Sequence, residues 1–496
     1  MKISKIHLSI FTALIALTGA AAAEDQYLIR VPANVNLSAA TPETPSEPIS
    51  VVLSPEALPA GTVGEPYSFN LADRLSITGG TGSYNLGDVA WSLKAGDALP
   101  TGLSLSNGTI AGTPTVKNEA GTSFEVTGTY QDASGQQVYA IVVGGQTLKV
   151  KQISAGGINT CAATIAGAAV CWGNNTISGQ YHSQNRPIVI AGLESGVSKI
   201  SIGDYHACAI QNGALKCWGN NHSGQIGNGE TSNGAVIYPV IYPVSVIGMD
   251  SEVSDVAAGS RFTCSIKAGQ AYCWGENTYS NLGLGFTGGA IVTPMPVADS
   301  GVATKLTAGE VHACAYFNGI PKCWGHGAEG QLGLGDASSR HTPTPMTDTS
   351  WSSLKASYRR TCGVKNGGAY CWGQNSYGEL GIAGGTSANV PNPVQDLASG
   401  VTGLAGGNFH TCAIQQGTVK CWGASNVGQL GLGSIASSAT PAAVQGLNNV
   451  SMLVAAGMHT CAVTTSGATK CWGDNQRGQL GDGTFSGKNT PVDVLP

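Results

Sequence analysis

The sequence is poor in charged and aromatic side chains, which make up 11% and 6% of its 496 residues. With 71 glycines, that composition suits short strands joined by tight turns rather than a helical enzyme or a disordered tail. The length exceeds what one ordinary core organises, so two domains or a repeat array are expected.

A long hydrophobic run is also missing. The one marked apolar stretch, Leu8 to Leu17, is too short to cross a bilayer. It follows Lys2 and Lys5 and precedes small residues that offer a cleavage site after Ala23, as in a secretory signal. We expect residues 1–23 to be removed, leaving a periplasmic, cell-surface or extracellular protein without membrane insertion. No cysteine stands at that site, which argues against a lipid anchor.

Basic clusters are absent. Removing residues 1–23 takes away two lysines and no carboxylate, so the formal net charge falls from −5 to −7. Lys and Arg are scattered singly along the remainder, whereas binding to a phosphate backbone needs a basic face. We therefore expect no nucleic-acid partner.

The usual catalytic motifs are absent too. There is no G-x-S-x-G elbow, H-E-x-x-H helix or P-loop. Carboxylates such as Asp474 and Asp482 are expected to be solvated loop residues rather than an acid–base pair. We expect no cofactor, no metal and no catalysis.

The region before the repeats divides into two parts. Residues 24–50 are rich in Thr, Pro, Glu and Ser and predict an extended linker. Residues 51–145 alternate apolar and polar side chains, as at Tyr67 to Leu71, which predicts an all-β sandwich with Trp91 in its core. Within it, LPTGLSLSNGTIAGTPT (Leu99 to Thr115) resembles immunoglobulin-like (cadherin-like) modules of exported bacterial proteins. The resemblance implies a spacer or adhesion module.

From residue 148 to 496 the sequence repeats itself around the tripeptide Cys-Trp-Gly, at intervals of 46, 56, 50, 48, 50 and 50 residues. Seven copies at this period indicate a propeller or solenoid. The copies, with pieces such as GQLGLG (Gly330 to Gly335), resemble the regulator-of-chromosome-condensation repeat family, which implies a closed seven-bladed β-propeller. The tripeptide begins at Cys171, Cys217, Cys273, Cys323, Cys371, Cys421 and Cys471.

A Pro-containing apolar strand precedes each of repeats two to seven, and one further copy, Thr490 to Leu495, ends the chain. Because no repeat follows this copy, we predict that it pairs into the first blade and removes an open sheet edge.

The fourteen cysteines form seven pairs. Cys208 and Cys217 are symmetrical about Asn212-Gly213, the preferred dipeptide of a type I′ hairpin. Counting outward from this turn places the two cysteines at a non-hydrogen-bonded position, where the Cα atoms are about 4.5 Å apart and a disulfide fits. The same symmetry relates Cys264 to Cys273, Cys314 to Cys323, Cys362 to Cys371 and Cys412 to Cys421.

Two pairs are one residue further apart. Cys161/Cys171 and Cys461/Cys471 have a glycine, Gly167 or Gly467, where a three-residue loop needs a left-handed backbone. Zinc binding is the alternative for paired cysteines, but zinc sites prefer spacings of two to four residues and an exported chain meets oxidising conditions. We predict seven disulfides.

Four histidines stand two residues before a cysteine, at His206, His312, His410 and His459. A metal ring is one interpretation of this pattern. The other is a structural role, which the family resemblance implies, because family members commonly carry a histidine here. Asn159, Phe262 and Arg360 fill the matching position in the other copies, which favours structure, and the tryptophans after cysteine are expected to be core residues.

The longest interval contains a duplication, Ile237 to Val240 and Ile241 to Val244. One hypothesis is that the surplus copy forms a rim loop whose Tyr238 and Tyr242 contact a partner. The other is that it only lengthens an outer strand.

Together these features predict an exported, non-enzymatic interaction scaffold whose propeller face binds a protein partner. A secreted propeller-type inhibitor of another protein and a glycan-binding or glycan-hydrolysing protein remain as alternatives. The resemblance also implies guanine-nucleotide exchange on a small GTPase, as in nuclear family members. Export, acidic charge and the added module separate this chain from that role.

Overall fold

The computed structural model describes residues 47–80, 83–145, 148–174, 182–232, 240–382 and 385–496. Apart from two short 3-10 helices, its regular elements are all β-strands, and they form two compact units divided between residues 146 and 147. No helix within the described ranges is long and apolar enough to cross a membrane. The predicted signal segment and most of the predicted linker lie outside the described residues.

The N-terminal unit is a β-sandwich of two larger sheets, ordered β2-β9-β8-β5 and β3-β7-β6, with a two-stranded sheet β1-β4. Its strands alternate buried and exposed residues, because one face of each sheet packs on the core. Its elements are β1 (Ser50–Leu53), β2 (Gly61–Thr62), β3 (Tyr67–Asn70), η1 (Leu71–Arg74), β4 (Leu75–Thr78), η2 (Leu86–Asp88), β5 (Ala90–Leu93), β6 (Leu103–Ser106), β7 (Thr109–Gly112), β8 (Asn118–Tyr130) and β9 (Ala133–Gly144).

The core of this unit gathers buried side chains from both sheets, among them Leu71, Ile110 and Phe124. Trp91 is partly buried and packs against them. The unit contains no cysteine, so apolar burial stabilises it without a covalent link.

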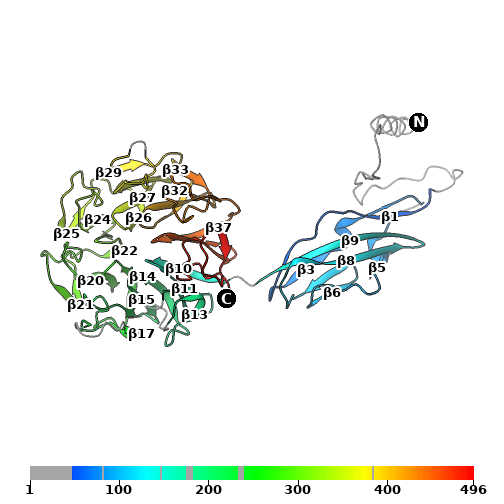
Figure 1. The fold of residues 1–496 in the computed structure, drawn as a ribbon, viewed down its shortest axis with the longest axis horizontal. Coiled ribbons are helices and arrows are strands. Elements are labelled where there is room, and N and C mark those ends of the chain that lie inside the picture. Colours follow the sequence, from blue (N-terminus) through cyan, green and yellow to red (C-terminus); the bar gives the residue numbers. More distant parts are fainter. Residues whose placement is uncertain (1–46, 81–82, 146–147, 175–181, 233–239, 383–384) are drawn as a thin grey trace. The chain divides into compact units, whose positions relative to one another are not determined.

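The C-terminal unit is a propeller of seven four-stranded sheets, arranged around a central axis (Figure 1). We call the strands of each blade A to D, from the axis outward. Blades one to four comprise β10 (Val150–Gly156), β11 (Asn159–Thr164), β12 (Ala169–Gly173), β13 (Gln184–Val189); β14 (Val197–Ile202), β15 (His206–Gln211), β16 (Ala214–Gly219), β17 (Val240–Ser245); β18 (Val253–Ala258), β19 (Phe262–Lys267), β20 (Gln270–Glu276), β21 (Ala290–Pro296); and β22 (Ala303–Ala308), β23 (His312–Phe317), β24 (Ile320–Gly325), β25 (Arg340–Pro345).

All strands within a blade are antiparallel neighbours, so each blade is a continuous meander of the chain. Blades five to seven comprise β26 (Trp351–Ser357), β27 (Arg360–Lys365), β28 (Gly368–Gly373), β29 (Ala388–Pro393); β30 (Val401–Gly406), β31 (His410–Gln415), β32 (Thr418–Gly423), β33 (Ser438–Ala443); and β34 (Val450–Ala456), β35 (His459–Thr464), β36 (Thr469–Gly473), β37 (Lys488–Asp493).

The hairpin between strands B and C carries the disulfide. In blade two Asn212 and Gly213 have φ of 52° and 83°, the left-handed values of a type I′ turn. Cys208 lies opposite Cys217 in the register, and their Cα atoms are 4.0 Å apart. All seven cysteine pairs are joined in this way. Gly167 and Gly467 have φ of 88° and 83° in the two longer loops.

The predicted pairing of the last strand with the first blade is wrong. β37 pairs with β36 and is strand D of blade seven. Each Pro-containing strand is therefore the last strand of its own blade, where an unpaired outer edge tolerates proline. The ring closes by a different contact: the Leu148 amide donates to the Val494 carbonyl at 2.9 Å, and Lys149 forms a β-bridge with Ala468.

Candidate functional site

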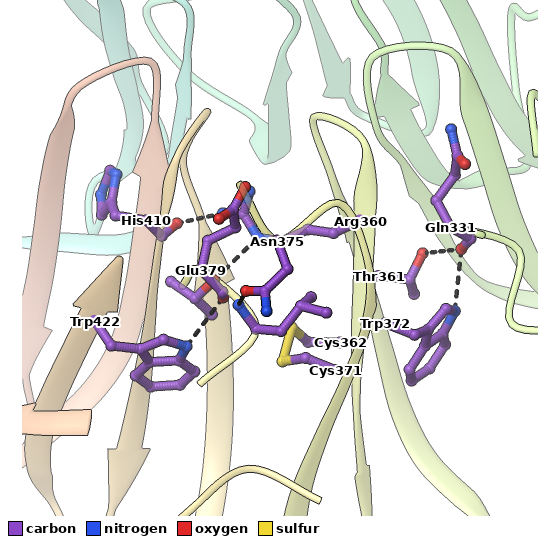
Figure 2. The surroundings of a disulfide bond; sticks show 12 residues. Gln331, Arg360, Thr361, Cys362, Cys371, Trp372, Asn375, Glu379, His410 and Trp422 are labelled. Atoms are coloured by element: carbon purple, nitrogen blue, oxygen red, sulfur yellow. Dashed lines mark hydrogen bonds between the residues drawn. A yellow bond between two sulfur atoms is a disulfide. The ribbon is translucent and has the colours of Figure 1, made fainter. Parts of the chain in front are cut away.

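Five of the seven seams between blades have, among the described residues, a carbonyl that accepts two hydrogen bonds from the next blade. For example, the Glu379 carbonyl accepts from Trp422 Nε1 at 3.0 Å (Figure 2). It also accepts from the Thr411 hydroxyl at 2.7 Å. The tryptophan belongs to Cys-Trp-Gly and is fully buried. The equivalent double acceptors are the carbonyls of Gln225, Gln331, Gln429 and Gln479.

The four histidines of strand B cross the same seams. His206 Nε2 lies 2.6 Å from the hydroxyl of Thr263 in the next blade. Since that hydroxyl donates its own proton to the Gln225 carbonyl, it accepts from the histidine, which is therefore protonated on Nε2. The matching pairs are His312 with Thr361, His410 with Thr460 and His459 with Thr160.

The two blades without a His or Arg at this position meet an alanine instead of a threonine. Phe262 occupies the histidine position of blade three, and Ala313 occupies the threonine position of blade four. Likewise, Asn159 occupies the histidine position of blade one, and Ala207 the threonine position of blade two. Burial lowers the pKa of His206, His312 and His410 to about 3 and that of His459 to about 4. The histidines are thus neutral seam residues. In the part of the chain that the structure describes, no three His, Cys, Asp or Glu side chains gather as a metal site.

Arg360 replaces the histidine in blade five. Its buried guanidinium donates to Thr411 Oγ1 and to the carbonyls of Gly407, Asn408 and His410. Burial lowers its pKa to about 10, while the neighbouring Glu379 carboxylate raises it (Figure 2). Glu379 stands where other blades have Gln or Asn, so this seam contains a compensated pair of charges.

One face of the propeller, which we call the AB face, consists of the loops between strands A and B and the segments that follow each Cys-Trp-Gly. The backbone of this face is the same in every blade. In blade two the Asn220 amide donates to the Tyr205 carbonyl at 2.9 Å, and in blade five the Gln374 amide donates to the Arg359 carbonyl at 3.0 Å.

The side chain beside this repeated backbone bond differs from blade to blade. Only the carbonyl is required for the bond, so the residue type is free. The position is occupied by Ile158, Tyr205, Arg261, Val311, Arg359, Phe409 and Met458.

Aromatic and cationic side chains on the AB face of blades two to six form three groups of ring and cation–π contacts. Arg261 lies over the Tyr205 ring, and the Tyr279 and His326 rings meet edge to face at 5.0 Å. We call the whole set the AB strip. Its members are Tyr205, Arg261, Tyr279, His326, Tyr358, Arg359, Tyr377 and Phe409.

At the seam between blades five and six, Phe409 packs against Tyr358 and Tyr377, with ring centroids 5.4 and 5.0 Å apart. Arg359 donates from Nε to Glu310 at 2.8 Å, and this bond raises the pKa of the guanidinium. Tyr205, Tyr279 and Tyr377 are 46%, 44% and 54% exposed, so a partner can reach them.

Two acidic residues of the AB loops, Asp204 and Glu310, line the central channel. Burial raises the pKa of Asp204, which a hydrogen bond from Ser260 opposes. Burial also lowers the pKa of His326 in the strip. The face therefore combines aromatic, cationic and acidic groups in a rigid frame, which suits recognition of a polar protein surface.

The residues predicted from sequence lie elsewhere. Tyr242 is exposed on β17, the outermost strand of blade two, and Tyr238 lies outside the described residues. Asp474 and Asp482 accept hydrogen bonds from Gln479 and Asn475 within one loop. The sequence did carry a signal for the AB strip: one variable residue per repeat, directly before the position of the seam histidine.

Comparison with known proteins gives separate family matches for the two units. The family models described as "Regulator of chromosome condensation (RCC1) repeat" match residues 212–266, 366–414 and 416–463, and residues 197–225 and 459–479. The model described as "Putative Ig domain" matches residues 49–144.

Among curated proteins, the ultraviolet-B receptor UVR8 of Arabidopsis thaliana is 30% identical over 146 residues, which cover 28% of this chain and 32% of UVR8. The E3 ubiquitin-protein ligase HERC2 of Homo sapiens is 29% identical over 147 residues, 28% of this chain and 3% of HERC2. The chain thus spans about a third of the first relative and a small part of the second.

Among solved structures, human WBSCR16 is similar with a TM-score of 0.60 and 21% identity over 67% of this chain and 94% of that one. Yeast RCC1 (Prp20), solved with Kap60, has a TM-score of 0.60 and 18% identity over 67% of this chain and 84% of its own. These similarities show the fold. The chain therefore carries regulator of chromosome condensation repeats in its propeller, preceded by an immunoglobulin-like domain.

Proposed function

We propose that this protein is an exported, non-enzymatic scaffold whose propeller binds a protein partner through the AB face. The observation that carries the proposal is the AB strip, in which tyrosine, phenylalanine and arginine side chains gather on one rigid face. These are the residue types enriched at protein interfaces and among the residues that contribute most to binding.

Seven disulfides support the exported setting, because such bonds persist in oxidising compartments. The partner is not inferred from yeast RCC1 and Kap60, since 18% identity shows only a common fold. Tyr242 on the outer strand remains a candidate contact of its own.

The test is quantitative capture from the envelope and medium of the producing cell with the oxidised protein. One variant removes three exposed tyrosines of the strip, Tyr205→Ala, Tyr279→Ala and Tyr377→Ala. The matched control removes three exposed aliphatic side chains from the opposite face, Ile165→Ala, Ile247→Ala and Val302→Ala.

A protein partner held by the wild type and the control but lost by the tyrosine variant would support the proposal. Equal loss in both variants, or retention of glycan without any protein, would reject it. An enzyme assay on the captured partner then distinguishes a scaffold from an inhibitor.

A further inference from the structure

The central channel of the propeller contains one residue that breaks the repeat. The channel has a volume of about 270 Å³ and is lined by the A strands. At the strand A position that pairs with the first cysteine of each blade, the other blades have small or apolar side chains, but blade five has Lys355. The matching residues are Ser154, Ser201, Ala257, Thr307, Ala405 and Val454.

The small polar groups at this level are already engaged between blades. The Ser201 hydroxyl accepts from the Ala258 amide at 3.0 Å, and the Thr307 hydroxyl accepts from the Ala356 amide at 3.0 Å. Among the described residues, Lys355 has no hydrogen-bond or ion-pair partner for its ammonium. Because Lys355 lines the channel, its three donors are available to whatever occupies it.

The neighbouring charges do not satisfy Lys355. Lys199, the other lysine of the channel, forms an ion pair with Asp255. The Asp255 carboxylate also accepts from the amides of Val256 and Leu306, so three donors already share its two oxygens. The two lysines and one aspartate leave a net positive charge at this level.

Water reaches Lys355 inside the channel, yet protein surrounds it on all sides. This desolvation lowers the pKa of the ammonium, Lys199 lowers it further, and Asp255 raises it. A second negative charge in the channel would offset both unfavourable effects.

Other acids facing the channel lie at its AB end, beyond the level of Lys355. Glu310 accepts a hydrogen bond from Arg359, and Asp204 accepts one from Ser260. These carboxylates make the AB entrance unfavourable for anions. The net positive charge lies deeper in the channel, at the level of Lys355.

We infer that the channel holds a compact anion, a carboxylate or a phosphate-like oxyanion, with Lys355 as its principal ligand. The volume admits such a group together with a few waters, each of which takes about 30 Å³. Charge-assisted hydrogen bonds from an ammonium are the contacts that such anions prefer. This site is independent of the proposed partner on the AB face.

The experiment is calorimetric titration of the intact oxidised protein with inorganic phosphate and, separately, with acetate, at constant ionic strength. Lys355→Met should weaken binding at least about tenfold, because it removes a charge-assisted bond. Lys305→Met is the matched control: Lys305 lies on the neighbouring A strand, but its ammonium donates to the Ser352 carbonyl and does not line the channel.

A second variant reverses the sign of the effect. Asp255→Asn removes a negative charge and releases Lys199, so anion affinity should rise while the fold, followed by thermal unfolding, persists. Absence of binding by either probe to the wild type would overturn the inference. Unchanged affinity in Lys355→Met would overturn it as well, and so would equal losses in Lys355→Met and Lys305→Met.

Discussion

The two faces of the propeller are built under different constraints. On the face opposite the AB face, which we call the BC face, the turns between strands B and C repeat nearly the same dipeptide, as in Asn212-Gly213 and Asn318-Gly319. On the AB face, a repeated backbone bond is combined with a side chain that changes from blade to blade. The repeat thus fixes the chemistry of one face and leaves the other free for recognition.

The constraint on the BC face comes from the hairpin. In five blades the disulfide pair is closed by a two-residue turn with both residues left-handed, and few residues adopt that backbone. The AB loops need only a carbonyl acceptor. Substitutions on the BC face should therefore affect stability, and those on the AB face should affect binding.

Acid should have the largest effect, and it should act on the stability of the seams between blades. The folded pKa values of the four seam histidines lie near 3 to 4, below the unfolded value, so their stabilising contribution is complete above about pH 6.5 and is lost as pH falls towards 3. Each histidine contributes a slope of about 1.4 kcal/mol per pH unit in that range. Urea unfolding of the propeller between pH 7 and 4 measures it.

The chain supplies the control for this prediction. The double variant His206→Phe and Thr263→Ala reproduces the natural seam of Phe262 and Ala313. It should lower the slope of the unfolding free energy against pH by the contribution of one histidine. The N-terminal unit has no histidine in residues 47–145, so its transition should not show this slope. An unchanged slope in the double variant would refute the histidine assignment.

Opening one BC hairpin is the next largest perturbation. Replacing Cys314 and Cys323 by alanine removes a bond that closes a loop of 9 residues, and should cost about 2–3 kcal/mol of propeller stability. Guanidinium unfolding followed by tryptophan fluorescence measures the change. The cysteine-free N-terminal unit should be indifferent to reduction, and equal sensitivity of the two units would contradict the comparison.

A single turn residue should have a smaller effect. Gly319 has φ of 80° with open space around the position of a Cβ, so Gly319→Ala adds backbone strain alone and should cost about 1–2 kcal/mol. Gly385→Ala is the control, because Gly385 also has open space but has no left-handed φ. Thermal unfolding of both variants decides it, and equal costs would show that the turn backbone is not limiting.

The smallest effect on stability should come from the AB strip. Tyr205→Ala removes an exposed side chain and should change the free energy of unfolding by less than about 0.5 kcal/mol. The same substitution should weaken binding to the captured partner by about 1 kcal/mol or more, if the strip contributes strongly to binding. Surface plasmon resonance against that partner, with Ile247→Ala as control, makes the measurement.

Local signals predicted much of the fold. The Asn212-Gly213 turn and the pairing register around it follow from hairpin geometry, and the structure has both. The seven tryptophans that follow cysteine were expected to be core residues, and all of them are fully buried.

The phase of the blades did not follow from the repeat. A periodic marker gives the interval between blades but not the strand at which a blade begins, so the strand at Thr490 was placed in the wrong blade. The structure pairs it with the adjacent strand β36, which closes a shorter loop.

The AB strip could not be assembled from the sequence, because its members are contributed by five blades and meet only where neighbouring blades pack together. Tyr358, Tyr377 and Phe409, for example, come together across the seam between blades five and six. Each looks like an ordinary loop residue until the seams bring them into contact.

The most direct test of the central claim is hydrogen–deuterium exchange of the wild-type protein with and without its captured partner. The account predicts slower exchange in the AB loops of blades two to six and unchanged exchange in the BC turns. Protection confined to the BC turns or to the outer strands would contradict it. The AB loops concerned are residues 203–205, 259–261, 309–311, 358–359 and 407–409.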